Sequence, residues 1–339
     1  MLVLDGSSGE GGGQILRSSL ALSMVTGTAF RIENVRAKRP KPGLMRQHLA
    51  AVRAAAEISS ARVEGDEIGS RALTFRPGRV RPGDYAFAVG TAGSTTLIFQ
   101  TVLPALIFAS GSSHVTLEGG THNPLAPPFD FLRAAYLPLL ARMGPRVDVA
   151  LERPGFYPAG GGRFTATIDP VETLDALVLL ERGEILDRRA TAVVSKIPES
   201  VAERELRVIR DHFAWPEESF RSEVVTSSPG PGNIVTIEIE AEHVTEVFCG
   251  FGEIRRPAEK VAMDAVAECR RYLASDAPVG EHLADQIILP LALAGSGAFR
   301  ATAVTRHTTT HIELLKRFLD RDIVVERIAR TTFEIRVGG

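Results

Sequence analysis

A histidine beside a predicted helix is the first residue whose type and position suit covalent chemistry. His307 lies in TRHTTTHIELLKRF, residues 305–318, where hydroxyl side chains surround it between a predicted strand and a predicted helix. A neutral imidazole is a nucleophile that can attack phosphorus and form a phosphoramidate. Two other interpretations compete. His307 and His311 are four residues apart and could share a helix face as metal ligands, or the pair could be structural. No HEXXH motif or further Cys/His cluster completes a metal site.

A glycine-rich segment near the N-terminus is suited to binding an anion. It reads DGSSGEGGGQILR over residues 5–17 and opens a predicted helix, whose free N–H groups can bind phosphate. It is not a Walker motif, because no Lys-Ser/Thr pair follows the glycines. Glu10 is a candidate ligand for a divalent metal ion, and Arg17 is a candidate phosphate clamp. The alternative is a flexible cap with a solvated Glu10.

A basic segment follows at VRAKRPKPGLMRQH, residues 35–48. It has five basic residues and no acidic one: Arg36, Lys38, Arg39, Lys41 and Arg46. The prolines at positions 40 and 42 stiffen the loop. A pre-ordered basic loop favours a polyphosphate or an RNA end. The alternative for any charge run is a solvated face.

Three further segments are candidate walls of a nucleotide-sized pocket. In GEHLADQIILP, residues 280–290, Asp285 stands near a predicted helix start, where it either caps the helix or bonds a ribose or adenine. GGTHNPLAPP, residues 119–128, is rigid enough to wall an adenine pocket and is equally typical of a structural turn. GFYPAGGG, residues 155–162, has the same two interpretations.

These motifs fall at corresponding places in three similar segments. Each has an apolar helix, a glycine turn, a strand, a second helix and a strand pair. The first helices are predicted to end at the C-cap glycines Gly27, Gly111 and Gly297. We therefore predict three such units in one α+β domain, with equivalent loops that bring Arg36, the segment at Thr121 and His307 together. The predicted strands are 30–35, 114–117 and 299–304, the second helices are 44–58, 129–143 and 310–319, and the strand pairs are 61–75, 146–168 and 323–337.

An interruption between the second and third units has its own pattern. Residues 180–276 alternate predicted strands (190–197, 233–240, 244–248) with helices (200–213, 257–274). We interpret it as a small α/β domain inserted into the large one. The expected division is a large domain of residues 1–180 and 276–339, and a small domain of residues 181–275.

Composition bounds the class of protein. The chain has 339 residues, 44% hydrophobic, and a formal net charge of −2, so any nucleic-acid site must be a local basic patch. Two cysteines, Cys249 and Cys269, are too few for a disulfide framework and fit a reducing compartment. The N-terminus lacks a signal-peptide pattern, and the apolar runs at 97–108 and 287–293 are too short to span a bilayer. We expect a cytoplasmic protein without a membrane segment; a dimer is compatible with the sequence but not indicated by it.

The motifs gain specificity from their order along the chain. DGSSGEGGGQILR, RAKRPKPGLMRQH, GTAGS, GGTHNPLAPP, GFYPAGGG and GEHLADQ together resemble the RNA 3'-terminal phosphate cyclase family, over essentially the whole sequence. The resemblance implies three βαβαββ repeats similar to the C-terminal domain of translation initiation factor 3, with a small thioredoxin-like domain inserted before the third. It also implies ATP as co-substrate, Mg²⁺ or Mn²⁺, and RNA 3'-phosphate ends as substrate.

The resemblance also implies roles for individual residues. His307 falls where the family carries its adenylated histidine, and Glu10 where a metal ion would bind. His282 stands where a tyrosine is expected to stack on adenine; an imidazole stacks with less area, so a change in nucleotide affinity or selectivity is expected. The nucleotide and phosphate site would include Glu10, Gln14, Arg17, Arg36, Arg39, Gln47 and His48, with Gln100, Pro127 or Pro128, and Asp285 near the adenosine.

The implied reaction has three steps. His307 takes AMP from ATP, the RNA 3'-phosphate then takes AMP from the histidine, and the neighbouring 2'-OH closes the cyclic phosphate. Two alternatives stay open. One is a ribosome-assembly relative without cyclase chemistry, which lacks the adenylated histidine. The other is an enolpyruvyl-transferase-like enzyme, which also repeats a βαβαββ unit and would bind a small anionic sugar.

Overall fold

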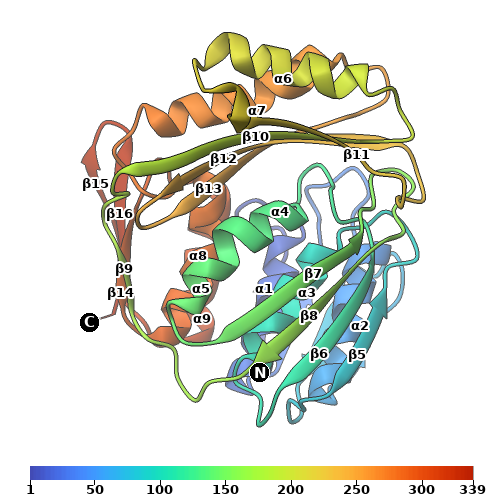
Figure 1. Ribbon diagram of the computed structural model, residues 1–339. Helices are drawn as coiled ribbons and strands as arrows, with labels where there is room; N and C mark the ends of the chain where they lie inside the picture. Colours follow the sequence, from blue (N-terminus) through green and yellow to red (C-terminus); the bar gives the residue numbers. More distant parts are fainter. Residues whose placement is uncertain (339) are drawn as a thin grey trace.

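In the described part of the chain, four sheets of four strands each form the framework of the protein (Figure 1). The computed structural model describes residues 1–338. Three of the sheets share one strand order. In each, the first strand pairs in parallel with the second, while the fourth lies antiparallel between the second and the third. The three equivalent sheets lie around a shared layer of helices.

The first unit occupies residues 2–76. Its first helix is buried along most of its length, and its buried residues include three serines as well as apolar side chains. The helix ends where Gly27 adopts φ 71° and donates its N–H to the carbonyl of Ser23, as the sequence predicts. The second helix buries an alanine-rich face between its neighbours. The elements are β1 (Leu2–Asp5), α1 (Gln14–Thr26), β2 (Phe30–Glu33), α2 (Arg46–Ser59), β3 (Arg62–Glu64) and β4 (Leu73–Arg76).

The second unit differs in its second helix, which includes a π-helical turn. Its first helix starts after Ser94, whose hydroxyl accepts a hydrogen bond from the Leu97 N–H. The predicted cap at Gly111 is wrong, because the helix ends at Leu106 and Ile107 continues with right-handed geometry. The elements are β5 (Asp84–Ala88), α3 (Thr95–Leu106), β6 (Ser113–Gly119), α4 (Phe129–Phe131), η1 (Leu132–Tyr136), α5 (Leu137–Ala141), β7 (Arg146–Arg153) and β8 (Gly162–Asp169).

The third unit takes its first strand from before the long interruption. β9 (Leu177–Leu179) pairs in parallel with β14 (Gly297–Ala301). The interruption therefore lies inside the third unit, after its first strand, and not ahead of that unit as expected. The helix cap is also corrected, since Gly295, with φ 82°, ends the first helix instead of Gly297. The remaining elements are α8 (Glu281–Ala294), α9 (Arg306–Phe318), β15 (Ile323–Ala329) and β16 (Thr332–Val337).

Residues 185–273 build the fourth sheet and two helices that cover one of its faces (Figure 1). Their apolar side chains form a core of their own, separate from the core shared by the three units. Both cysteines are free, and Cys269 belongs to this core. The elements are β10 (Ile185–Ser195), α6 (Ser200–His212), η2 (Glu217–Ser219), β11 (Phe220–Val224), β12 (Gly232–Ala241), β13 (Thr245–Phe251) and α7 (Ala258–Leu273).

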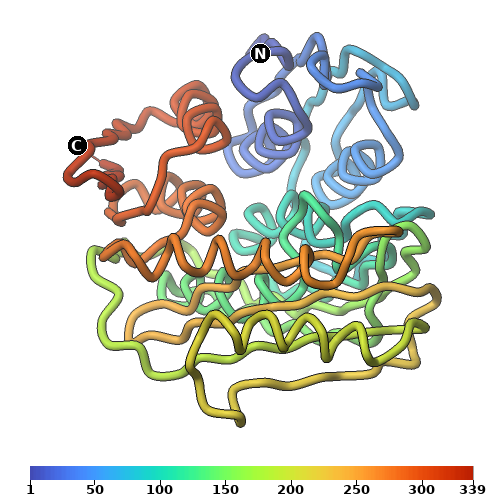
Figure 2. The backbone as a smooth tube through the Cα atoms, turned by 90° about the horizontal axis from the view of Figure 1, so that it is seen from above, coloured from blue at the N-terminus to red at the C-terminus, as the bar shows by residue number. Residues whose placement is uncertain are grey.

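The first and third units lie side by side although they are at opposite ends of the chain (Figure 2). α1 packs against α3 of the second unit and against α9 of the third. Arg317 on α9 donates a hydrogen bond of 2.7 Å to the carbonyl of Val3 on β1. α1 and α9 also meet at their starts, where His307 lies 3.0 Å from Gln14. None of the helices within residues 1–338 combines the length and the apolar character needed to cross a bilayer.

Candidate active site

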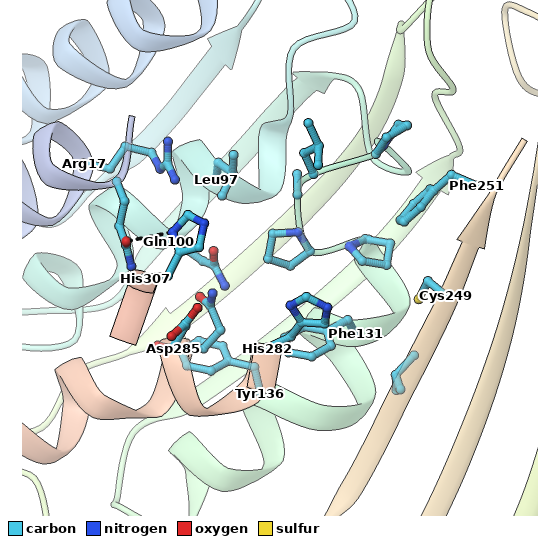
Figure 3. Close-up of a pocket in the computed structure, with 18 of the residues that line it drawn as sticks. Arg17, Leu97, Gln100, Phe131, Tyr136, Cys249, Phe251, His282, Asp285 and His307 are labelled. Atoms are coloured by element: carbon cyan, nitrogen blue, oxygen red, sulfur yellow. Dashed lines mark hydrogen bonds between the residues drawn. The ribbon is translucent and has the colours of Figure 1, made fainter. Parts of the chain in front are cut away.

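His307 lies in the first turn of α9, and the loop predicted for it is wrong. The helix begins at Arg306, because Thr305 and Thr308 form a reciprocal capping box. His307 Nδ1 lies 3.0 Å from Oε1 of Gln14, which begins α1 (Figure 3). An amide oxygen only accepts, so Nδ1 carries the proton and Nε2 keeps its lone pair. No hydrogen bond to Nε2 is formed within residues 1–338.

The imidazole of His307 is held in its neutral form. Partial burial lowers its pKa, and although Asp285 raises it, the positive charges of Arg17 and Arg39 lower it further. Near pH 7 the ring therefore carries an unprotonated nitrogen, which is the state that nucleophilic attack requires.

The residues around His307 line a cavity of about 910 Å³. This size is near the upper end of the ~300–1,000 Å³ typical of ligand pockets. The walls come from all three units and from residues 185–273, as the close-up shows (Figure 3). Of the residues predicted from sequence, the cavity is lined by Glu10, Gln14, Arg17, Arg39, Gln100, Pro127, Pro128, His282, Asp285 and His307.

One end of the cavity carries charges suited to phosphate. Arg39 forms an ion pair with Glu10 Oε1. Arg17 is enclosed, and its burial lowers the pKa of the guanidinium to about 10, so the group stays positive at neutral pH. The loop is fixed to α9, since the Glu10 N–H donates to Thr310 Oγ1 at 3.1 Å. The side chains of Glu10, Arg17 and Arg39 line the same cavity as the His307 ring.

Three predicted phosphate-site residues do not line the cavity and lie behind it. Arg36 donates to the carbonyls of Lys41 and Gly43 at 2.8 and 2.9 Å, which fixes the basic loop. Gln47 accepts a hydrogen bond of 2.9 Å from the Ser94 N–H. His48 is enclosed, and burial together with nearby arginines lowers its pKa to about 3. These side chains position the loop and α3 within this structure.

The glycine run allows two side chains to press against its backbone. A Cβ at Gly13 would lie 2.5 Å from His48 Nε2 and 2.7 Å from Arg17 Nη1. Both distances are shorter than any real contact, so a larger residue would displace the imidazole or the guanidinium. The glycine at this position is therefore explained by close packing against His48 and Arg17.

Asp285 ties α8 to the start of α9 and does not cap its own helix. α8 begins at Glu281, so Asp285 lies in the second turn and is buried. Its Oδ1 accepts a hydrogen bond of 2.5 Å from Thr308 Oγ1, and Thr305 Oγ1 lies 3.3 Å away. Burial raises the pKa of Asp285, although the hydrogen bonds from Thr308 and Thr305 lower it in part. The carboxylate thereby holds the turn that presents His307.

The remaining walls of the cavity combine prolines, an amide and a histidine. Pro127 and Pro128 form part of one wall, and Gln100 contributes an amide whose Nε2 is buried without a partner within residues 1–338. His282 projects from α8 near Phe131 (Figure 3). Its Nε2 lies 3.6 Å from Glu268, which raises the pKa of His282 to about 9. At neutral pH this wall therefore presents an imidazolium at the position where the resemblance predicts a stacking ring.

The residues fit a divalent metal at Glu10 better than at the histidine pair. His307 and His311 belong to no group of three close His, Cys, Asp or Glu side chains, and the one such group within residues 1–338 is Glu268, Glu281 and His282. His311 is buried with Nδ1 3.2 Å from the Asp285 carbonyl. Glu10 Oε2 is buried and has no hydrogen-bond partner among the described residues. Mg²⁺ commonly uses one or two carboxylates plus substrate phosphates, so a single free oxygen suffices.

The apolar part of the cavity has no recognisable signal in the amino-acid sequence. Phe131 and Tyr136 come from the helical stretch of the second unit, and Val247, Cys249 and Phe251 from β13. As single apolar residues they look like core residues, and α4 and β13 meet only in the folded chain. Burial raises the pKa of the Cys249 thiol, so it stays protonated.

Comparison with known proteins identifies the family. The family model described as "RNA 3'-terminal phosphate cyclase" matches residues 8–325. A protein of Koribacter versatilis named RNA 3'-terminal phosphate cyclase is 54% identical over 319 residues, covering 94% of this chain and 90% of the relative. Relatives of the same name from Pseudomonas fluorescens and Ralstonia nicotianae are 50% and 53% identical, covering 98% and 95% of this chain and 96% and 93% of theirs. The chain belongs to the RNA 3'-terminal phosphate cyclase family.

Proposed function

We propose that this chain uses ATP to convert an RNA 3'-terminal phosphate into a 2',3'-cyclic phosphate, with His307 as the nucleophile. The observation that carries the proposal is the hydrogen bond from His307 Nδ1 to Gln14 Oε1. It leaves a neutral Nε2 in a cavity that also holds Arg17 and Arg39. The names of the relatives, at about half identity over nearly the full length, support the same activity.

In the first step, His307 Nε2 attacks the α-phosphorus of ATP. A P–N bond forms, the bond from the α-phosphorus to the bridging oxygen breaks, and pyrophosphate leaves. Arg17 and Arg39 stabilise the charge that develops on the phosphates. The Gln14 amide oxygen accepts a hydrogen bond from the His307 Nδ1–H, which keeps the ring in the tautomer whose Nε2 can attack.

In the second step, an oxygen of the RNA 3'-phosphate attacks the same phosphorus. The P–N bond breaks, so AMP moves to the RNA end and His307 is regenerated. In the third step, the ribose 2'-OH loses its proton and attacks the RNA phosphorus, and AMP leaves with the electrons of the broken P–O bond. This attack is intramolecular, which lowers its entropic barrier, and a DNA end without a 2'-OH cannot undergo it.

Glu10 would hold Mg²⁺ or Mn²⁺, with the substrate phosphates as the other ligands. The metal ion would supply charge neutralisation for the leaving pyrophosphate. Among the remaining side chains, Gln100, Pro128, His282 and Asp285 would surround the adenosine. Arg36, Gln47 and His48 would act from behind the cavity, by fixing the basic loop and α3.

We further propose that the architecture is that of the family: three repeats similar to the C-terminal domain of translation initiation factor 3, and a thioredoxin-like domain between β9 and α8. The common strand order of three sheets and the separate core of residues 185–273 support this proposal. The corresponding boundaries are residues 1–180 and 276–339 for the large domain, and 181–275 for the small one. A cytoplasmic location agrees with the two free cysteines.

The test is incubation of the purified protein with α-labelled ATP and Mg²⁺ or Mn²⁺, beside a His307→Ala variant. Acid-labile, alkali-stable label on the wild type alone would support a histidine–AMP. An RNA with a 3'-phosphate should then discharge the label and gain a cyclic end. An absence of label on folded wild-type protein would contradict the mechanism and return attention to a binding role or a transferase activity.

A further inference from the structure

One stretch of the chain concentrates positive charge that the rest of the protein does not balance. Between Glu33 and Glu57 there are six Lys or Arg residues and no Asp or Glu, although the whole chain has a net charge of −2. Within residues 1–338 only one of the six, Arg39, forms an ion pair with a carboxylate. Unpaired cations gathered in this way favour a polyanionic partner.

Two of these cations lie on α2, away from the His307 cavity. Arg46 and Arg53 are both exposed and seven residues apart, two turns along one face, which spaces them by about 10 Å. Both line a groove of about 550 Å³. The elements on its two sides, α2 and β5, are neighbours in the fold (Figure 1). Neither has a carboxylate partner in the described part of the chain, and no acidic side chain lines the groove.

The floor of the groove is apolar. Leu49, Ala50, Phe87 and Val89 contribute to it, together with Ile68, which keeps 56% of its surface exposed. β5 is the edge strand of its sheet and pairs only with β6, so the outer side of its backbone has no partner strand. A positive rim above a partly aromatic floor is the combination with which proteins bind single-stranded nucleic acid, by phosphate pairing and base contact.

The groove is linked to the catalytic cavity by one stiff loop. Residues 36–46 carry Arg39 at the cavity and Arg46 at the groove, and the carbonyls of Lys41 and Gly43 are fixed by Arg36. Positively charged side chains thus follow the loop from the cavity at Arg39 to the groove at Arg46. The wall of the cavity formed by residues 185–273 has no excess of positive charge, because Glu253, Asp264 and Glu268 line it beside Arg256 and Arg271.

We propose that the groove between α2 and β5 binds the single-stranded RNA that precedes the 3'-phosphate. Arg46 and Arg53 pair with backbone phosphates, and a base rests on the apolar floor. This inference rests on the proposed function and adds to it where the body of the substrate lies. It predicts that RNA length matters beyond the terminal nucleotide.

The test uses the full chain with both arginines replaced, Arg46→Ala/Arg53→Ala. Arg207→Ala/Arg221→Ala is the matched control, because it removes the same charge from exposed positions on α6 and β11. Three quantities are compared among the proteins. The first is label transfer from ATP to the protein without RNA, and the second is the KM for 3'-phosphorylated oligonucleotides of two and of twelve nucleotides. The third is the salt dependence of binding to a twelve-nucleotide RNA with a 3'-OH. Arg46→Lys/Arg53→Lys serves as the charge-conserving variant.

The expected result for the alanine pair is unchanged labelling, with KM for the long RNA raised on the order of tenfold and KM for the short RNA unchanged. The slope of log K against log salt should shrink by about 1.4, which is 0.7 for each of two phosphates on a single strand. The lysine pair should retain most of the slope. If ATP does not label the wild-type protein, the proposed function is contradicted. Binding of the 3'-OH RNA does not depend on that reaction, so it still tests whether the groove binds RNA.

Equal length and salt dependence in wild type and alanine pair would overturn the groove proposal. So would an effect of the same size in the Arg207/Arg221 control, since the response would then reflect overall charge. A change in oligomeric mass by light scattering, without any change in RNA binding, would also contradict it and assign the groove to contacts between copies of the chain.

Discussion

Asp285 on α8 accepts a 2.5 Å hydrogen bond from Thr308 on α9, so two helices of the third unit are joined directly beneath His307. We predict that Asp285→Ala lowers the rate of label transfer from ATP by at least tenfold, because the turn that carries His307 loses its anchor. The free energy of unfolding should fall by about 1–3 kcal/mol, the cost of leaving buried hydroxyls unpaired. Denaturant unfolding and single-turnover labelling measure both quantities. A variant with wild-type labelling rate would show that the bond does not position the turn.

The Gln14–His307 contact predicts a specific pH response. Since partial burial lowers the pKa of His307 below its usual value near 6.5, the labelling rate should stay level as pH falls from 8 and decline only below about 6.5. Gln14→Leu should slow labelling by about 10- to 100-fold at every pH, because the tautomer is no longer fixed. Gln14→Glu places a carboxylate beside the ring, which raises the pKa of His307 and moves the decline to higher pH. A Gln14→Glu profile identical to that of the wild type would contradict the contact.

His311 links the site to acid stability. Burial lowers its pKa to about 4, so between pH 4 and 6.5 the unfolded chain binds a proton there that the folded chain does not. Stability contributed by the neutral ring is therefore lost as pH falls, by about 2 kcal/mol from pH 7 to pH 5.

Buried Glu205 and Glu246 act in the opposite direction, because burial raises their pKa values to about 8. The measurement is therefore a difference: urea unfolding of the wild type and of His311→Gln at both pH values. The wild type should lose about 2 kcal/mol more than the variant over this interval. Equal losses would show that His311 titrates normally in the folded protein.

Gly9 permits the glycine-rich loop to contact α9. Its φ is 51°, and an added Cβ would lie 1.9 Å from Thr310 Oγ1. We predict that Gly9→Ala displaces the loop, costs about 1–3 kcal/mol of stability and lowers the labelling rate severalfold. Gly27→Ala is the matched control, since Gly27 has φ 71° but an added Cβ meets nothing within 4 Å. The control should lose about 1 kcal/mol and keep its labelling rate; equal loss of activity in both would point to general destabilisation.

The elements with strong local signals were predictable from sequence. The α1 helix with its cap at Gly27 and the helix α7 follow from apolar periodicity and end residues. β5 and β9 have no such signal, because they are short and each is defined by pairing with a strand remote in sequence. The sequence pattern places the start of α9 too late, since the capping threonines resemble a loop.

The residues of the candidate site also differ in whether a local sequence signal indicates them. Glu10, Arg17, Arg39 and His307 stand in segments whose residue types indicate phosphate chemistry directly, and the structure brings them to one cavity. Phe131, Tyr136 and Phe251 give no such sign, because an apolar residue is recognised as a cavity wall only when its neighbours are known. The bond from Thr308 to Asp285 joins two different helices and has no local signature at all.

His307 and its hydrogen-bond partner Gln14 are separated by 293 positions in the chain. A ribosome making this protein completes the glycine-rich loop first and His307 nearly last. Under the proposed mechanism, a growing chain therefore cannot form the histidine–AMP, and neither can a prematurely ended product that lacks α9, even if its first two units fold. The spacing ties the onset of activity to the end of synthesis.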